Sequence, residues 1–191
     1  MKRRLLIVIA AAILVVAGSA VALAAMSGGP TGAVGPVGAC LNPFVTHFSV
    51  QQQGMVPALQ PGDTIVAPAV PAGTTFTRGE IILFRAPASF TADQSPFIKR
   101  VVGLPGETIS LAGGRVLVNG APLHEPYLAP GTVTDPMDKT SWTLGPSDLF
   151  VLGDGRSKSA DSRAFGPVSV SSVTGHATEI CAPDSRKGTL P

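Results

Sequence analysis

The fold of this chain is decided by the stretch FIKRVVGLPGE, which runs from Phe97 to Glu107. Its first half is apolar and β-branched, and it ends at a Gly-Leu-Pro-Gly turn, so the pattern predicts a strand that leads into a tight turn. Alternation along a strand puts Lys99 on one face with Phe97 and Val101. An ammonium group held among apolar side chains loses hydration, so its pKa falls and the neutral amine becomes available as a general base. The alternative is a lysine on an edge strand whose stem packs while its head reaches water.

Glycine and proline are frequent, and apolar runs are short. The 191 residues include 22 glycines and 18 prolines, and 45% of the chain is hydrophobic. This length allows one domain of ordinary size with a core, plus appendages. Few helical patterns occur outside the N-terminus, so many short strands are expected. They are predicted at 44–50, 64–67, 81–84 and 149–152, at 168–180 as one or two strands, and at 107–111 and 115–120 as a hairpin. Residues 125–146 are predicted to be a loop with at most one short strand.

The net charge of +2 is concentrated at the N-terminus. The 14 basic residues include Lys2, Arg3 and Arg4, so the rest of the chain carries 11 basic against 12 acidic residues. The sequence contains no basic stripe, no RNA-binding aromatic motif and no zinc-ligand spacing. Nucleic acid is therefore excluded as an expected partner, and neither a metal nor a cofactor is predicted.

An uncharged apolar run from Leu5 to Met26 follows the basic residues. At 1.5 Å of rise per residue, its 22 residues are long enough to cross about 30 Å of hydrocarbon. The positive-inside rule places the basic residues in the cytoplasm and the remainder of the chain outside. Residues 1–27 are therefore predicted to be a transmembrane anchor. A cleavable signal peptide is the alternative, because small residues such as Ala20 and Ala22 resemble a cleavage site.

The segment after the apolar run predicts a linker and a covalent closure of the domain. Residues 28–39 are rich in glycine and proline and lack periodicity, which is typical of a spacer. Cys40 and Cys181 then stand near the two ends of the folded part. In an extracytoplasmic domain a disulfide between them is one interpretation, worth about 2–4 kcal/mol. Two unpaired buried thiols are the other. Residues 183–191 are predicted to be a disordered tail.

Two irregular stretches interrupt the predicted strands. The first runs from Gln51 to Asp63, and its glycines and prolines exclude a helix or a continuous strand. The second, from Gly153 to Arg163, is dense in polar groups of opposite charge. On residue types alone, this second stretch is also typical of a solvated loop with weak surface ion pairs.

Three motifs occur in order behind the apolar N-terminal run: MVPALQPGD at 55–63, KRVVGLPGE at 99–107, and GD at 153–154 followed by SADSR at 159–163. This series resembles the bacterial type I signal peptidases, serine endopeptidases with a Ser/Lys dyad. The resemblance covers about residues 44–175 and the anchor. It implies a mostly antiparallel β catalytic domain, here residues 40–182, behind one transmembrane helix. It also implies an apolar surface at the active site that faces the membrane.

The resemblance implies a role for each matching residue. Lys99 corresponds to the general base, and Ser159 to the residue whose hydroxyl orients that lysine by a hydrogen bond. Asp161 and Arg163 match a buried ion pair that braces the site. The remaining matches support the two loops: Met55, Pro57 and Asp63 in the first, and Gly153 and Asp154 in the second.

One departure from the family pattern removes the nucleophile. The family's serine immediately precedes Met-x-Pro, and Gly54 occupies that position. Glycine has no side chain and so forms no acyl-enzyme. Gln52 stands where some members have an oxyanion-binding hydroxyl, and its amide and the Gly54 backbone N–H are the remaining donors. Ala58 replaces a common threonine, and Gly155 a common asparagine. Ser49 is an alternative nucleophile, although its position before the irregular loop argues against a direct replacement.

Two hypotheses of function follow from the resemblance. The first is a membrane-anchored, signal peptidase I-like serine endopeptidase that cleaves signal peptides from exported precursors and is impaired or inactive because Gly54 replaces the nucleophile. The second is a catalytically inactive protein that binds signal peptides or regulates their processing. In both, the partners are signal peptides and the lipid bilayer, and the protein is single-pass in the cell membrane with its β domain outside.

Overall fold

The structure is a computed structural model, and it describes residues 39–42, 45–91 and 95–190. The predicted anchor, residues 1–27, lies outside this range, as does the predicted linker except for Ala39. In the part of the chain that the structure describes, no helix has the length and apolar character needed to cross a membrane.

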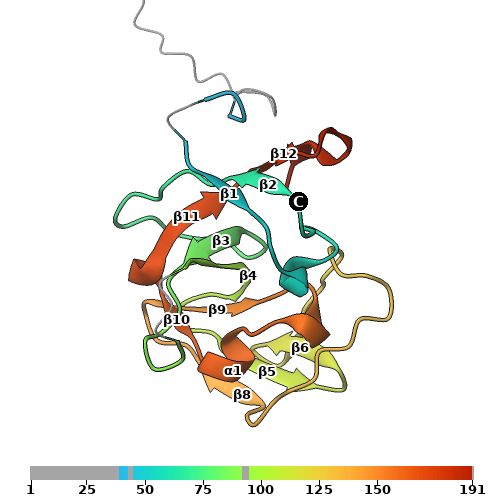
Figure 1. The fold of residues 1–191 in the computed structure, drawn as a ribbon. Coiled ribbons are helices and arrows are strands. Elements are labelled where there is room, and N and C mark those ends of the chain that lie inside the picture. Colours follow the sequence, from blue (N-terminus) through green and yellow to red (C-terminus); the bar gives the residue numbers. More distant parts are fainter. Residues whose placement is uncertain (1–38, 43–44, 92–94, 191) are drawn as a thin grey trace, which may run out of the picture. The chain divides into compact units, whose positions relative to one another are not determined.

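The described chain consists almost entirely of short antiparallel strands (Figure 1). They form three sheets with the orders β1-β2-β12-β13, β10-β9-β4-β3-β11 and β7-β6-β5-β8. The prediction of a mostly β, antiparallel fold is thereby confirmed. The strands are β1 His47–Ser49, β2 Thr64–Val66, β3 Ile81–Phe84, β4 Phe97–Gly103, β5 Thr108–Ala112, β6 Arg115–Val118, β7 Ala121–Pro122, β8 Ser141–Thr143, β9 Asp148–Leu152, β10 Val168–Ser169, β11 Val173–Ala177, β12 Glu179–Ala182 and β13 Gly188–Thr189.

The helical elements are single turns. One α-helical turn, α1, spans Ser162–Phe165, and the Asp161 carboxylate caps its N-terminus by accepting a hydrogen bond from the Arg163 N–H. The other turns are 3₁₀ helices: η1 Gln53–Met55, η2 Arg156–Lys158, η3 Val170–Ser172 and η4 Asp184–Arg186. The stretch from Gln51 to Asp63, expected to be irregular, therefore contains one 3₁₀ turn.

Strand β4, which holds the deciding stretch, lies in the middle of the five-stranded sheet. It pairs with β3 on one side and β9 on the other, and its residues from Lys99 to Gly103 are buried. Both faces of the strand are covered, because Ile98 packs on one apolar cluster while Val101 and Val102 belong to two others. Lys99 is therefore a residue of a central strand, and the alternative of an edge strand does not apply.

The predicted hairpin is formed by β5 and β6, with Gly113 and Gly114 in the turn. Both glycines adopt positive φ angles, 57° and 72°, which side-chain-bearing residues rarely adopt. The Asn119-Gly120 pair makes a second turn, into β7. The poorly patterned segment 125–146 contributes one short strand, β8, which pairs with β5.

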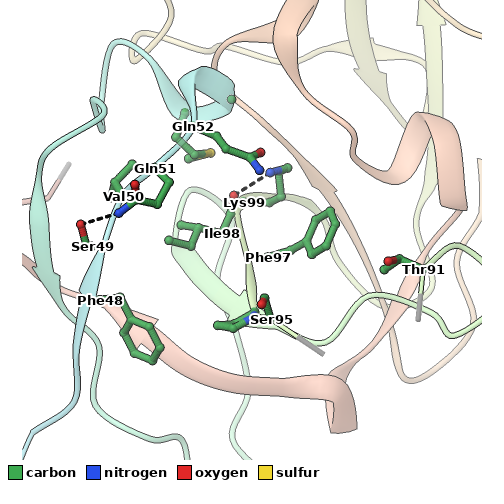
Figure 2. Close-up of a pocket in the computed structure, with 13 residues that line it drawn as sticks. Phe48, Ser49, Val50, Gln51, Gln52, Thr91, Ser95, Phe97, Ile98 and Lys99 are labelled. Atoms are coloured by element: carbon green, nitrogen blue, oxygen red, sulfur yellow. Dashed lines mark hydrogen bonds between the residues drawn. The ribbon is translucent and has the colours of Figure 1, made fainter. Parts of the chain in front are cut away.

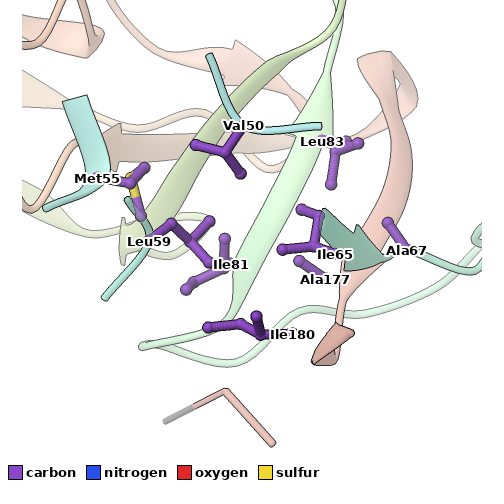
Figure 3. Packing of buried hydrophobic residues seen from close by; sticks show 9 residues of the cluster. All are labelled: Val50, Met55, Leu59, Ile65, Ala67, Ile81, Leu83, Ala177 and Ile180. Atoms are coloured by element: carbon purple, nitrogen blue, oxygen red, sulfur yellow. The ribbon is translucent and has the colours of Figure 1, made fainter. Parts of the chain in front are cut away.

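The first irregular stretch is held by its apolar residues. Met55 and Leu59 are buried beside Val50, Ile65 and Ile81, in a cluster that joins the sheet of β2 to the sheet of β3 (Figure 3). Hydrogen bonds from the Val56 N–H to the Gln53 carbonyl and from the Leu59 N–H to the Met55 carbonyl keep the chain compact there. The stretch is thus ordered by burial although it lacks a long regular element.

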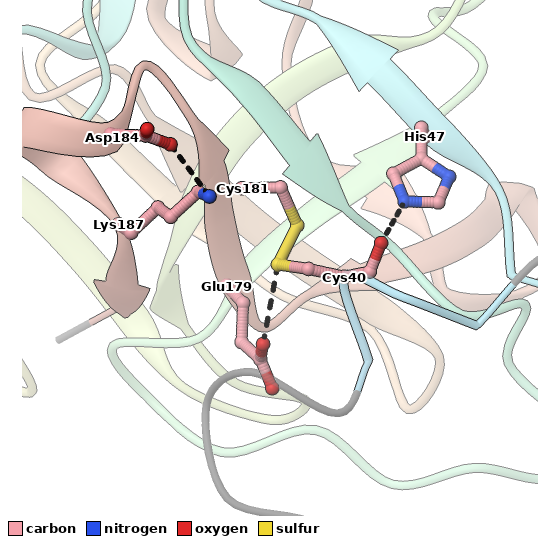
Figure 4. Close-up of a disulfide and its surroundings, with 6 residues drawn as sticks. All are labelled: Cys40, His47, Glu179, Cys181, Asp184 and Lys187. Carbon is pink, nitrogen blue, oxygen red and sulfur yellow. Dashed lines mark hydrogen bonds and ion pairs between the residues drawn. A yellow bond between two sulfur atoms is a disulfide. The ribbon is translucent and has the colours of Figure 1, made fainter.

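The C-terminal residues differ from the prediction of a disordered tail. Residues 184–190 form η4 and β13, and β13 pairs with β12 next to β2. Cys40 and Cys181 form a disulfide with a Cα–Cα distance of 5.4 Å (Figure 4). The Cys40 carbonyl also lies 3.4 Å from His47 Nε2, so the residues that lead into β1 are attached to the last sheet strands. Within the tail itself, the pairing of β13 with β12 and the ion pair of Arg186 with Asp63 hold the chain in place.

Candidate active site

Lys99 is a buried lysine whose amine faces the first irregular stretch. The residue is 7% exposed, and its Nζ donates a hydrogen bond to the Ile98 carbonyl at 2.9 Å. Burial lowers the pKa of Lys99 from 10.5 to about 8, against the opposing attraction of the Asp161 and Asp154 carboxylates. An amine with this pKa is partly neutral near neutral pH and is able to accept a proton.

The backbone brings Gly54 directly beside this amine. A Cβ atom at position 54 would lie 3.6 Å from Lys99 Nζ, 3.6 Å from the Lys158 carbonyl oxygen and 3.8 Å from Ser159 Cα. These are ordinary van der Waals distances, and the φ angle of Gly54 is outside the positive range. A serine or alanine side chain therefore fits here without displacing its neighbours. An oxygen on that Cβ would reach hydrogen-bonding distance of the amine.

A pocket of about 450 Å³ opens in front of Lys99 and Gly54 (Figure 2). In Figure 2 the side chain of Gln52 extends toward that of Lys99. The apolar part of the pocket is lined by Phe48, Phe97 and Ile98. Gln52 is exposed and precedes η1. Ser49, in β1, also lines the pocket, where its hydroxyl accepts a hydrogen bond from Gln51 Nε2 at 2.8 Å. The pocket thus combines an apolar wall with a small number of polar groups.

The predicted hydrogen bond between Ser159 and Lys99 is absent from the structure. Ser159 is buried, 7% exposed, and its Oγ has no hydrogen-bond partner, while the Lys99 amine donates to the Ile98 carbonyl instead. The Cα of Ser159 would lie 3.8 Å from a Cβ atom at position 54. A buried hydroxyl that makes no hydrogen bond carries a desolvation cost, and Ser159 Oγ is such a group.

The second irregular stretch packs against the first through two glycines. A Cβ atom at Gly153 would lie 2.2 Å from Ser159 Oγ and 2.3 Å from the Gly54 carbonyl oxygen. One at Gly155 would lie 2.5 Å from the Gln53 carbonyl oxygen, and the Gly155 N–H donates to the Gly54 carbonyl at 3.1 Å. Gly155, which stands where the family commonly has asparagine, therefore permits this close approach of the two loops.

Behind the two loops lies a set of buried ion pairs. Arg163 donates two hydrogen bonds to the Asp161 carboxylate, at 2.8 and 2.9 Å, and a third to the Arg156 carbonyl at 2.6 Å. Asp161 also accepts from the Gly153 N–H at 3.1 Å. The pair that the family resemblance implied thus lies behind the second loop. Because each member has a partner, the pair fixes the loop at Gly153 and Ser159.

Three charged residues in this region carried no prediction. Arg100 donates to both oxygens of Asp154, at 3.0 and 2.7 Å, and lies 4.1 Å from the centre of the Tyr127 ring. Arg156 pairs with Glu125 and donates to the Thr134 hydroxyl. Arg100 follows Lys99 on a strand that is buried on both faces, so its guanidinium points to the opposite side of the sheet. A buried guanidinium requires an acidic partner, and this was the sequence signal for the Arg100–Asp154 pair. Nothing in the sequence marked Glu125, which lies in the poorly patterned segment.

Asp63, at the end of the first stretch, is also buried and paired. It is 1% exposed, accepts from the Gln60 N–H at 2.8 Å and forms an ion pair with Arg186 at 2.8 Å. Within the described ranges, no three His, Cys, Asp or Glu side chains gather to hold a metal ion. What the arrangement offers is a buried amine beside residue 54, with acids that brace the loops around it.

Comparison with known proteins yields one consistent family. A family model described as "Signal peptidase, peptidase S26" matches residues 31–182. A signal peptidase I of Leptolyngbya laminosa is 37% identical over an alignment of 150 residues, and the match covers 74% of this chain and 70% of that protein. One from Bacillus caldolyticus is 32% identical over an alignment of 150 residues that covers 72% of this chain and 80% of that protein. A crystal structure of a signal peptidase I from Enterococcus faecalis is 32% identical and covers 54% of this chain and 97% of its own, with a TM-score of 0.45.

Proposed function

Since the chain belongs to the signal peptidase family, peptidase S26, we propose that it receives signal peptides of exported precursors and cleaves them only weakly, because Gly54 replaces the nucleophile. The observation that carries this proposal is the distance of 3.6 Å between a Cβ at position 54 and Lys99 Nζ. The base stands where a nucleophile of residue 54 would need it. The side chain of residue 54 is the missing part of the pair.

With serine at position 54, the proposed reaction follows from this geometry. The neutral Lys99 amine takes the hydroxyl proton while Oγ attacks the scissile carbonyl carbon, and the resulting ammonium then protonates the leaving amine. The backbone N–H of residue 54 and the Gln52 amide are the proposed donors to the oxyanion. Ser159 is proposed to orient the lysine, and Asp161 with Arg163 to brace Gly153 and the second loop. Met55, Pro57 and Asp63 hold the first loop.

With glycine at position 54, no acyl-enzyme forms. In serine proteases that lack a member of the triad, binding and the oxyanion site still give about 10³–10⁴ over the uncatalysed reaction. Enzymes usually reach about 10⁶–10¹⁷. The proposed activity of the protein is therefore a trace of that of a complete signal peptidase.

A second candidate function is a signal-peptide-binding or regulatory pseudo-enzyme. The observation that favours it is the intact pocket of about 450 Å³ beside a position that lacks a nucleophile. The two functions share a location in the proposal. The basic residues Lys2 to Arg4 and the apolar run from Leu5 to Met26 support a single-pass anchor in the cell membrane, with the β domain outside.

The decisive experiment is the substitution Gly54→Ser in the full-length protein, assayed in detergent with a purified preprotein. Removal of the nucleophile costs a serine protease about 10⁶ in kcat, so cleavage is expected to rise by at least about 10². Gly54→Ala is the matched control: it adds the same Cβ without the hydroxyl, and cleavage is expected to stay at the level of the parent. Lys99→Met in the Gly54→Ser background is expected to abolish the gain.

Signal-peptide binding to the unchanged protein separates the two functions. Binding together with a trace of cleavage supports the weak peptidase, whereas binding without turnover supports the pseudo-enzyme. If Gly54→Ser stays inactive and no signal peptide binds or competes, both candidate functions are wrong.

A further inference from the structure

The C-terminal turn η4 reaches back to the first irregular stretch through Arg186. Arg186 Nε donates to Asp63 Oδ1 at 2.8 Å, and Nη2 donates to Asp63 Oδ2 at 3.0 Å and to the Ala58 carbonyl at 3.0 Å. This residue lies beyond residue 182, where the family match ends. The three hydrogen bonds thus connect residues 58 and 63 to a segment outside the matched region.

Residues 58 and 63 belong to the chain segment that carries position 54. The Leu59 N–H donates to the Met55 carbonyl at 2.9 Å, so the turn held at Ala58 is continuous with η1. At the other end, the Val50 N–H donates to the Asp63 carbonyl at 2.8 Å, and the Gly62 N–H to the Val50 carbonyl at 2.9 Å. Both ends of the segment 50–63 are therefore joined to the residues that Arg186 contacts.

The strands on either side of η4, which carries Arg186, are held by sheet pairing and by the disulfide. Strand β12 pairs with β2, β13 pairs with β12, and Cys181 in β12 is bonded to Cys40 (Figure 4). Because these strands hold η4 in place, the Arg186 side chain can fix the position of the residues that it contacts.

We propose that Arg186 is a positioning residue that holds the segment 50–63 and thereby sets the place of residue 54 against Lys99. Asp63 is 1% exposed, and Arg186 is its ion-pair partner. Without the guanidinium, the buried carboxylate keeps the Gln60 N–H but loses its counter-charge, which is costly unless water reaches it. The segment relaxes outward to admit that water, and residue 54 moves with it. The proposal rests on the proposed function only in taking residue 54 and Lys99 as the reacting pair.

A thiol introduced by Gly54→Cys measures this distance without any peptidase activity. The chain has two cysteines and both are in the disulfide, so the new thiol is the single free one. Beside the Lys99 ammonium the thiolate is favoured, and its pKa falls below the ordinary value of about 8.5. Lys158 approaches position 54 with its backbone carbonyl oxygen, and its ammonium donates to Gln53 Oε1. The Asp154 and Asp161 carboxylates act on the thiol through their attraction for Lys99. The rate of alkylation by iodoacetamide between pH 5 and 10 reports the thiol pKa.

Four variants of the Gly54→Cys protein give the test. Lys99→Met sets the scale, with alkylation at pH 7 expected to slow about tenfold. Arg186→Gln and Arg186→Lys are each expected to slow it at least about threefold. Arg186→Lys keeps the positive charge but loses the planar fork, so its effect separates positioning from a distant charge effect. Lys187→Gln is the matched control next to the same turn, since Lys187 forms an ion pair with the exposed Asp184, and no change is expected.

Unfolding is measured for every variant at the assay temperature. If Arg186→Gln fails to fold, the comparison of Arg186→Lys with Lys187→Gln decides. The proposal is overturned if Arg186→Lys leaves the alkylation profile unchanged, or if Arg186 and Lys187 variants behave alike. A failure of Gly54→Ser to cleave preprotein would contradict the proposed function alone, because the thiol profile does not depend on turnover.

Discussion

Lys99 combines a buried position with a single hydrogen bond to the Ile98 carbonyl. The loss of hydration outweighs the attraction of Asp161 and Asp154, so its pKa falls to about 8. The unfolded chain binds more protons than the folded one between about pH 8 and 10.5. The charge at Lys99 therefore lowers the free energy of unfolding below about pH 8, and this penalty disappears as the pH rises toward 10.5.

The substitution Lys99→Met is expected to stabilise the protein at pH 7. Methionine has a similar length and no charge to bury, so the free energy of unfolding should rise by about 1–3 kcal/mol. The gain should shrink strongly by pH 10, where the lysine is neutral in the folded state. Urea unfolding at both pH values checks this. Lys158→Met, at an exposed lysine, is the control, and a gain that is equal at pH 7 and 10 would contradict the argument.

Individual residues of the site were predictable to different degrees. The position of Lys99 on a strand among apolar residues followed from alternation alone. The proximity of Gly54 to Lys99 followed only from the family resemblance, because 45 residues separate them in the chain. The predicted hydrogen bond from Ser159 to Lys99 is absent from this structure, in which Lys99 donates to the Ile98 carbonyl, and no sequence pattern encodes that choice of partner.

At the level of elements, the two irregular stretches form one unit because their backbones touch. Gly155 is the point of closest approach, where a Cβ would meet the Gln53 carbonyl oxygen at 2.5 Å. Gly54, one residue further along the facing loop, has room for a Cβ at 3.6 Å. The two facing glycines thus differ sharply in how much an added methyl group would lower the free energy of unfolding.

The pair Gly155→Ala and Gly54→Ala tests this contact. Gly155→Ala forces backbone against backbone and is expected to lower the free energy of unfolding by about 1–3 kcal/mol. Gly54→Ala adds a methyl group at ordinary contact distance and is expected to be neutral or to stabilise by up to about 1 kcal/mol. Chemical denaturation of the two variants checks the difference. Equal effects would show that the loops are further apart than described.

The strands were more predictable than the turns. Apolar, β-branched runs bounded by glycine or proline marked β2, β3, β4 and β9, since burial of a short run needs no distant information. The order of η4 and β13 was missed because it depends on Arg186 finding Asp63, 123 residues away. A polar tail rich in small and charged residues gave no local sign of that partner.

For the whole molecule, the disulfide between Cys40 and Cys181 closes a loop of 141 residues. Cross-linking residues so far apart removes much of the freedom of the unfolded chain, which loop-closure arguments place at about 4–5 kcal/mol. Of the two interpretations that the sequence left open, the structure contains the bonded one. Strand β12, which contains Cys181, lies between β2 and β13.

The double substitution of Cys40→Ser and Cys181→Ser is therefore expected to lower the free energy of unfolding by about 2–5 kcal/mol. Replacing both residues avoids a lone reactive thiol. Thermal or urea unfolding of the variant against the parent gives the value, and dithiothreitol treatment of the parent should give a similar loss. An unchanged midpoint in both measurements would contradict the expectation.

The same bond has a mechanical consequence. A pulling force applied to the N-terminal segment and the C-terminal end passes from Cys40 to Cys181 through a covalent link, and strands β1 to β11 carry none of it. The sequence separation of 141 between the cysteines corresponds to roughly 500 Å of extended chain that the force does not reach. Reduction of the sulfur–sulfur bond would release that length. The redox state of this one bond therefore decides how far the domain extends under force.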